Sequence, residues 1–195
     1  MRCLYCYNPE IVLGKGSVAF SDAISFLKSR QGLLDAVVFS GGECLMHKKF
    51  REQIREVKQL GFLTKIDTNG SKPGVLQELI SENLVDYVAL DFKATPAEFA
   101  TLTQTDLYDE WEKSFRILLN AAVAFEIRTT VHSELTSPNE LNQMMAYLDS
   151  NKYSGNYCIQ PFRNNVDTLS PLRPSSRMRG SDLNSPSRFT LVLRD

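Results

Sequence analysis

The chain of 195 residues carries a net charge of −1, and 43% of its residues are hydrophobic and 23% charged. This near-neutral, globular composition excludes a protein that is basic enough throughout to coat nucleic acid or an anionic membrane surface. No apolar run approaches the roughly 20 residues that span a bilayer, and no signal-peptide pattern opens the chain, so we expect neither nucleic acid nor membrane as a partner.

A cysteine pair stands at the start of the chain. Cys3 and Cys6 have the C-x-x-C spacing that lets two thiolates reach one metal centre. Alone, this spacing leaves iron–sulfur, zinc and redox chemistry open. Cys44 and Cys158 are too isolated to form a disulfide scaffold with the pair, so these sparse thiols predict a reducing cytoplasm.

Helix-like and strand-like segments alternate behind this pair. Ser21 is expected to cap a helix whose inward face includes Phe26. Ser137 is expected to cap another, with Pro138 at its first position. The predicted helices cover residues 21–27, 47–60, 74–82, 111–122 and 138–149. The predicted strands cover residues 36–39, 62–66, 85–90, 125–131 and 157–160.

This alternation predicts an α/β fold with a parallel sheet. A full eightfold barrel takes about 250 residues, so the length favours an open, partial (βα)6-type barrel. Residues 1–170 are expected to form this domain. Residues 171–195 are expected to form an irregular tail rich in Arg, Ser and Pro, in which residues 189–193 are the candidate for an edge strand.

The basic residues change type towards the tail. All those that follow Phe162 are arginines: Arg163, Arg173, Arg177, Arg179, Arg188 and Arg194. A solvated tail is the simpler interpretation. An arginine cluster that binds a phosphate or an acidic partner is the alternative.

Every predicted strand ends in a polar cluster. In barrel-like α/β folds, chemistry gathers at the carboxyl ends of the strands. The clusters are Gly41-Gly42-Glu43, Asp67-Thr68-Asn69-Gly70, Asp91-Phe92-Lys93 and residues 128–132 and 160–163.

Each cluster also has a simpler structural interpretation. In the functional interpretation, the two glycines let the backbone approach a ligand, and Glu43 holds its ammonium group. In the structural interpretation, the same three residues form a tight turn followed by an exposed Glu43. Asp91 and Lys93 point to one side of their strand end, either as an ion pair or with Lys93 meeting a ligand carboxylate. Asp67 belongs either to an Asn-Gly turn or, with Thr68, to a ribose or cation site.

Taken in order with the cysteine pair, these clusters resemble the activating enzymes of glycyl-radical enzymes in the radical S-adenosylmethionine (SAM) superfamily. Residues 3–10 look like the C-x-Y-C-H-N-P-E loop of anaerobic ribonucleoside-triphosphate reductase activating proteins, with Tyr7 where His is usual. The match continues in order through residues 35–43, 61–70, 84–94, 125–131 and 160–163, and the resemblance covers about residues 3–172.

The resemblance implies a [4Fe–4S] cluster and SAM as cofactors, with Cys3 and Cys6 as two of the three cluster ligands. It implies that Tyr5 lies near the adenine and that Lys93 meets the methionyl carboxylate. Gly41, Gly42 and Glu43 match the motif that meets the methionyl amino group. The other matched cofactor-binding positions are Asp67, Asn69, Asp91 and Arg128.

The sequence departs from the family pattern in two places. The first cysteine of C-x-x-x-C-x-x-C would fall just ahead of Met1, so we expect an N-terminally incomplete domain that lacks this cysteine and the first strand. Cys44 follows Glu43 where the family usually has Pro, and is either a replacement ligand or a small buried residue. His132 ends a strand and is either a site residue or a structural histidine with its hydrogen bonds satisfied.

The sequence therefore predicts a cytoplasmic radical SAM oxidoreductase that generates a glycyl radical on a partner such as anaerobic ribonucleotide reductase. A flavodoxin- or ferredoxin-type protein is the expected electron donor. Two alternatives stay open: a radical SAM enzyme that acts on a small molecule or peptide, and a truncated, inactive domain that binds the cofactor or holds zinc.

Overall fold

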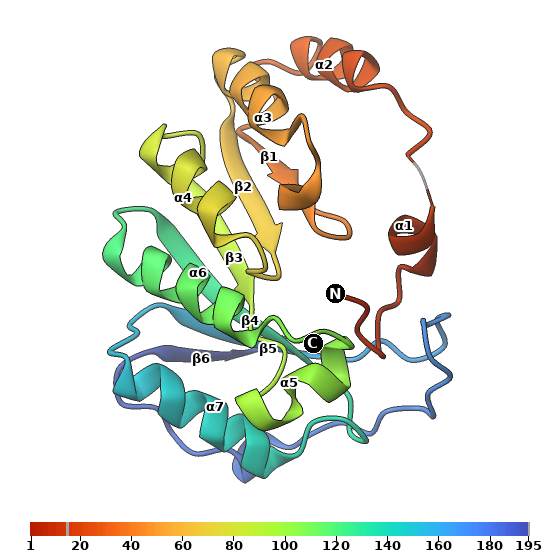
Figure 1. Cartoon of the computed structure of the whole chain (residues 1–195), viewed down its shortest axis with the longest axis vertical. Helices are drawn as coiled ribbons and strands as arrows, with labels where there is room; N and C mark the ends of the chain where they lie inside the picture. The colour runs from red at the N-terminus through yellow and green to blue at the C-terminus, as the bar shows by residue number, and fades with distance from the viewer. Residues whose placement is uncertain (15, 195) are drawn as a thin grey trace.

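The computed structural model describes residues 1–14 and 16–194. Its centre is one sheet of six parallel strands in the order β1 to β6, curved so that the strands turn steadily through the molecule (Figure 1). The strands are β1 (Ala36–Phe39), β2 (Leu63–Thr68), β3 (Tyr87–Asp91), β4 (Ala124–Val131), β5 (Asn156–Pro161) and β6 (Thr190–Leu193). Within the described residues no pairing joins β1 to β6, so the predicted open, partial α/β barrel is confirmed.

Helices α3, α4, α6 and α7 follow the outside of the curved sheet, whereas α1 lies apart from them on the other side of the molecule (Figure 1). The helices are α1 (Pro9–Leu13), α2 (Phe20–Lys28), α3 (Phe50–Gln59), α4 (Pro73–Ser81), α5 (Pro96–Thr103), α6 (Tyr108–Asn120) and α7 (Pro138–Ser150), with short 3-10 turns η1 (Cys44–Met46) and η2 (Gly180–Asp182). Within the described ranges, no helix is both long and apolar enough to cross a bilayer.

Two helix ends test the capping predictions. Ser137 caps α7 as predicted, because its hydroxyl accepts a bond from the Glu140 N–H at 3.2 Å and Pro138 occupies the first turn. The prediction for Ser21 is wrong. α2 begins at Phe20 with Ala19 at the cap position, so Ser21 lies inside the helix. Phe26 was expected to face inward, but it is 52% exposed.

The main core lies between the sheet and its helices. Ile66, Leu90 and Ile127 project from neighbouring strands and are fully buried. Trp111 of α6 stacks on Phe92 with 4.1 Å between the ring centroids, which fixes the residue between Asp91 and Lys93 at the end of β3. Because strand side chains alternate, the polar neighbours of these apolar residues point to the opposite, concave face of the sheet.

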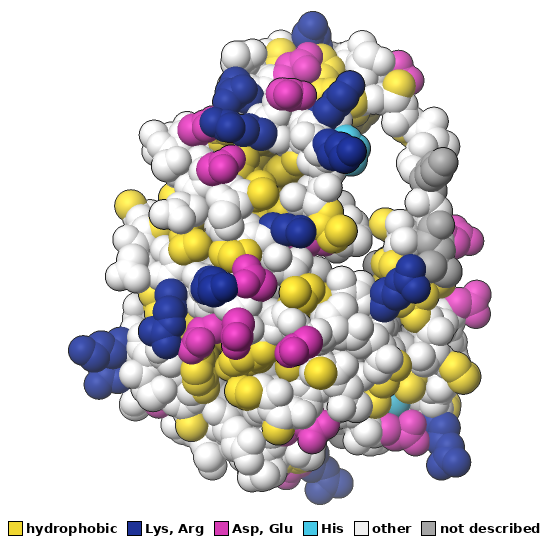
Figure 2. Space-filling model, in the orientation of Figure 1, with side chains coloured by type: hydrophobic (Ala, Val, Ile, Leu, Met, Phe, Trp, Pro, Cys, Tyr) yellow, Lys and Arg dark blue, Asp and Glu magenta, His cyan; other side chains and the backbone are white. Residues whose placement is uncertain are grey.

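The loop that carries Cys3 and Cys6, called here the cysteine loop, is held by backbone hydrogen bonds on both sides. On one side, Leu4 N–H donates to Leu102 at the end of α5 at 3.1 Å. On the other, Leu169 N–H donates to Cys6 at 3.0 Å and Ser170 N–H to Leu4 at 3.3 Å. The segment that leads into the tail is therefore part of the support of the loop. In the space-filling view an opening separates the α1 side of the molecule from α2 and β1 (Figure 2).

Candidate functional site

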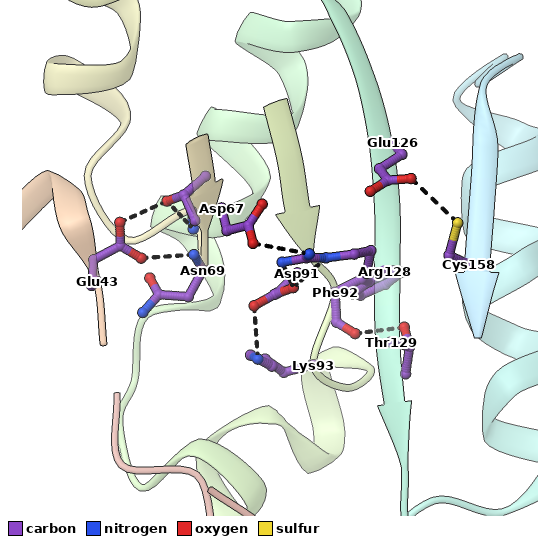
Figure 3. Close-up of polar contacts among 12 residues, drawn as sticks. Glu43, Asp67, Asn69, Asp91, Phe92, Lys93, Glu126, Arg128, Thr129 and Cys158 are labelled. Carbon is purple, nitrogen blue, oxygen red and sulfur yellow. Dashed lines mark hydrogen bonds and ion pairs between the residues drawn. The ribbon is translucent and has the colours of Figure 1, made fainter. Parts of the chain in front are cut away.

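The centre of the candidate site is an ion-paired group at the carboxyl ends of β2 and β3 and on the adjacent middle part of β4 (Figure 3). Asp91 Oδ2 accepts from Lys93 Nζ at 3.0 Å, and Asp91 Oδ1 accepts from Arg128 Nη2 at 3.0 Å. Arg128 also donates through Nη1 to Asp67 Oδ2 at 3.2 Å. The guanidinium thus joins two carboxylates on different strands, the planar recognition for which Arg is suited.

The charges in this group set one another's ionisation. Burial alone would raise the pKa of Asp91, but Lys93 and Arg128 outweigh it, so the pKa lies below its ordinary value. Burial alone would lower the pKa of Lys93, but Asp91 and then Tyr5 outweigh it and hold the pKa well above the usual value. The pair is therefore charged on both sides at neutral pH.

Glu43 forms a second part of the site, beside the end of β2. Its Oε1 accepts from Thr68 Oγ1 at 2.8 Å and its Oε2 from the Asn69 N–H at 2.7 Å. It also accepts from Leu45 N–H at 3.2 Å, which caps η1. Burial raises the pKa of Glu43 in spite of these bonds. Asn69 reaches the carboxylate through its backbone, so its side chain is not what holds Glu43.

The turn before Glu43 needs glycine. Gly41 has φ +97° and Gly42 has φ +58°, a region that side chains rarely adopt. Ile11 of α1 lies beside this turn, since a Cβ built at Gly41 would be 3.6 Å from Ile11 Cγ2. The two glycines thus provide an exposed turn next to the partly buried Glu43 carboxylate.

The cysteine loop supplies the third part of the site. Cys3 and Tyr5 are buried, at 7% and 3% exposure, in a small cluster with Phe162. Lys93 Nζ lies 5.8 Å from the Tyr5 ring centroid, so the loop and the end of β3 meet. Tyr5 Oη is buried, and the described residues provide no hydrogen-bond partner for it. Burial raises the pKa of the Cys3 thiol, and Lys93 opposes that shift.

The fit of the loop to a metal group is partial. Cys6 N–H donates to Cys3 at 3.0 Å, so both thiols belong to one tight turn beside Lys93. Within the described part of the chain, no group of three or more His, Cys, Asp or Glu side chains is placed to hold a metal ion. The turn can therefore contribute two thiolates to a cluster, and the third ligand is not found among these residues.

Cys44 does not complete the set. Its thiol lies 3.6 Å from the backbone oxygen of Asp67, and burial raises its pKa to about 12. Among the described residues, Cys44 does not join Cys3 and Cys6 in a group of three side chains that could hold a metal ion. The structure therefore favours the buried-residue interpretation of Cys44. His132 is fully buried, with Nε2 2.9 Å from the Arg173 carbonyl and its ring against Phe162, which favours a structural role as well.

A second charged cluster on the concave face was not predicted. Glu126 on β4 is 4% exposed and lies 3.2 Å from Lys65 Nζ, 2.9 Å from Arg194 Nη2 and 3.4 Å from Cys158 Sγ. Lys65 also approaches Asp67 at 3.9 Å, which joins this cluster to the ion-paired group. The sequence contained one sign of this cluster. Glu126 precedes Arg128 by two residues on one strand, which places both side chains on the same face of the sheet.

These contacts form one row of alternating charges across the concave face, called here the charge row. It runs through Lys93, Asp91, Arg128, Asp67, Lys65, Glu126 and Arg194.

The open parallel sheet, with a cysteine turn and charged side chains at the carboxyl ends of its strands, defines a partial-barrel α/β protein with a cofactor-type site. Residues 1–146 match the family profile of the Radical SAM superfamily. The chain therefore belongs to the radical SAM superfamily, as predicted.

Two curated relatives share part of the sequence. A protein from Methanocaldococcus jannaschii described as "Putative glycyl-radical enzyme activating enzyme" is 42% identical over 98 residues, which are 48% of this chain and 39% of that protein. The S-adenosylmethionine-dependent nucleotide dehydratase of Lacinutrix mariniflava is 28% identical over 106 residues, 50% of this chain and 22% of that protein. The matched region is thus less than half of either relative.

Solved structures show the same fold. A domain of a pyruvate-formate lyase-activating enzyme from Bacteroides vulgatus superposes with a TM-score of 0.58 at 17% identity, covering 70% of this chain and 86% of that one. Streptococcus suis SuiB bound to S-adenosylmethionine gives a TM-score of 0.64 at 12% identity, covering 100% of this chain and 47% of that one. At these identities the likeness concerns the fold.

Proposed function

We propose that this chain belongs to a radical SAM enzyme that activates a glycyl-radical enzyme, such as an anaerobic ribonucleotide reductase. The observation that carries the proposal is the meeting of the Cys3–Cys6 turn with Tyr5 and Lys93 at the mouth of a partial barrel. The 42% identity to a protein described as a glycyl-radical enzyme activating enzyme supports the choice within the superfamily.

The proposed cofactor site uses the three parts described above. Cys3 and Cys6 would be two of the thiolate ligands of a [4Fe–4S] cluster. Lys93 would receive the carboxylate of SAM, and its raised pKa keeps it cationic for that role. Tyr5 would lie against the adenine, where its unpartnered hydroxyl is available for a hydrogen bond.

Glu43 would receive the amino group of SAM, beside the exposed backbone of Gly41 and Gly42. The remaining proposed contacts are positional, since Asp91 and Arg128 hold Lys93 in place and Asp67 holds Arg128. Asn69 would act through its backbone N–H, which orients Glu43.

When bound, the cluster and SAM would supply the one-electron cleavage of SAM, which yields a radical that removes a hydrogen atom from a glycine of the partner. The chain's own contribution is to bind, orient and partly bury the reactants. A flavodoxin- or ferredoxin-type donor and a cytoplasmic location are part of the proposal.

The experiment is anaerobic reconstitution of the full-length protein, followed by iron analysis and an assay for 5′-deoxyadenosine with and without a glycyl-radical enzyme. We expect about four irons per protomer and a glycyl radical signal by electron paramagnetic resonance. Zinc in place of iron, or no SAM cleavage, would favour an inactive or zinc-holding domain.

A second candidate is a radical SAM enzyme that acts on a small molecule. The 28% identity to a nucleotide dehydratase over half of this chain favours it. In that case, 5′-deoxyadenosine formation should be stimulated by nucleotides and should not require a glycyl-radical enzyme.

A further inference from the structure

A small cavity lies where the tail crosses the ends of the last strands. It has a volume of about 150 Å³. Its apolar wall is formed by Val131 of β4, Ile159 of β5 and Leu193 of β6, with Leu183 contributed by the tail. The side chains of Val131 and Ile159 are buried, so this wall belongs to the folded core rather than to a loose surface loop.

The rim of the cavity is basic. Arg177, Arg179 and Arg194 line it, and none of the described lining residues is acidic. Arg179 is exposed, and Arg194 is paired with Glu126 at 2.9 Å. A pocket with an apolar wall and a guanidinium rim is complementary to an apolar group flanked by carboxylates.

The segment that carries the rim is anchored at several points. Ser133 N–H donates to Ser175 Oγ at 3.0 Å, and Ser176 N–H donates to Ser133 Oγ at 3.0 Å. Farther along, Asn142 of α7 accepts from Asn184 N–H at 2.8 Å. These bonds keep the cavity formed without a ligand, which lowers the ordering cost of binding.

The size of the cavity selects the kind of occupant. Sites for small organic ligands measure about 300–1,000 Å³, well above the volume found here. A single apolar side chain is a better match, and such side chains are the usual anchors of protein interfaces when they enter a preformed pocket. The occupant is therefore expected to be part of a protein rather than a free small molecule.

The position of the cavity links it to the cysteine loop. The segment that leads to the rim contains Leu169 and Ser170, whose N–H groups bond to the loop. Ser176, which lines the cavity, is six residues beyond Ser170, so by chain length it lies within about 22 Å of Ser170. A protein bound at the rim would thus sit on the same support that holds Cys3 and Cys6.

We propose that this cavity and its arginine rim form a docking site for a partner protein, which presents an acidic segment with one apolar anchor side chain. The site requires neither the cluster nor SAM, so it goes beyond the proposed function and can be tested without it. It also gives a binding role to three of the six arginines that follow Phe162.

The test uses a fluorescein-labelled acidic heptapeptide with one central leucine, titrated with the full chain by fluorescence anisotropy at low salt. Binding should weaken at least tenfold when the central leucine is replaced by alanine, when Arg179→Glu reverses a rim charge, or when Leu183→Trp fills the cavity. Arg188→Glu is the matched control, because Arg188 is exposed on the same tail and does not line the cavity.

Three results would overturn the proposal. One is no binding to the wild-type chain. Another is equal loss for Arg179→Glu and Arg188→Glu, which would indicate charge attraction without a site. The third is equal affinity for the leucine and alanine peptides. Circular dichroism melting curves of the variants establish that they are folded, and failure of SAM cleavage in a separate assay would leave this result unaffected.

Discussion

Arg128 and Asp91 pair across neighbouring strands, with 3.0 Å between Arg128 Nη2 and Asp91 Oδ1. The same guanidinium reaches Asp67 on the far side of β3 at 3.2 Å. One side chain therefore fixes two carboxylates, and through Asp91 it fixes Lys93 as well.

Replacing Arg128 should destabilise the fold. Arg128→Met leaves the two carboxylates facing each other in a partly buried site, where loss of one partner of a buried ion pair costs about 3 kcal/mol. Urea denaturation should show this loss, and Asp67→Asn in the same chain should recover part of it. Arg116→Met is the control, because Arg116 pairs with Glu112 on an exposed helix face and should change stability by less than about 0.5 kcal/mol.

Replacing Lys93 should separate ligand binding from folding. Lys93→Met removes the proposed carboxylate contact, so the affinity for SAM measured by calorimetry should fall at least tenfold. Lys113→Met, at an exposed helix position, should leave the affinity unchanged. Unaltered SAM binding by a folded Lys93→Met variant would contradict the assignment of Lys93.

The lowered pKa of Asp91 predicts an acid-labile contribution to stability. Because its folded-state pKa is below the unfolded value, about 3.9, this contribution is complete above that value and is lost as pH falls through the folded pKa. Between about pH 5 and pH 2, the free energy of unfolding of the wild type should therefore fall more steeply than that of Asp91→Asn. Parallel pH profiles would show that Asp91 gains nothing from its partners in the fold.

The four thiols should differ in reactivity. Cys3 and Cys158 are buried, and Cys44, although partly exposed like Cys6, has a pKa that burial raises to about 12. Brief alkylation at pH 8, followed by peptide mass spectrometry, should thus modify Cys6 first. Cys44→Ala should leave the iron content of reconstituted protein unchanged, and a loss of iron in that variant would restore Cys44 as a ligand candidate.

The backbone bonds that hold the cysteine loop can be tested by removing one of them. Leu169→Pro removes the N–H that donates to Cys6, so Cys3 should become more accessible and react faster with iodoacetamide. Asp167→Pro is the matched control, since the structure shows no backbone bond from Asp167 N–H within the described residues. Equal Cys3 reactivity in both variants would mean that this bond does not control access to the loop.

Much of the fold could be predicted because its strands are short apolar runs with clear breaks. Residues 36–39 were predicted to be a strand and form β1. In contrast, α5 was missed, because its sequence PAEFATLT has a weak apolar pattern in which only Phe99 and Leu102 suggest a helical face. Helix starts were harder still, as Ser21 shows, because a good capping residue one position inside a helix has the same local sequence signal.

The candidate site was predictable where polar residues follow strands, as with Asp91 and Lys93. The bonds that hold the cysteine loop were not predictable, because Leu169 and Ser170 make them through backbone N–H groups, which every residue except proline has. The Glu126 cluster was missed for another reason. Its partners Lys65 and Arg194 are distant in sequence, and only the sheet order brings their side chains over the intervening strands.

The charge row has a consequence for electroneutrality. Its cations are Lys93, Arg128, Lys65 and Arg194, and its anions are Asp91, Asp67 and Glu126. Four positive charges against three negative ones leave the row one anion short. The carboxylate group of a ligand arriving beside Lys93 would complete the balance of the row, and this local pairing would stabilise the folded chain as the ligand binds.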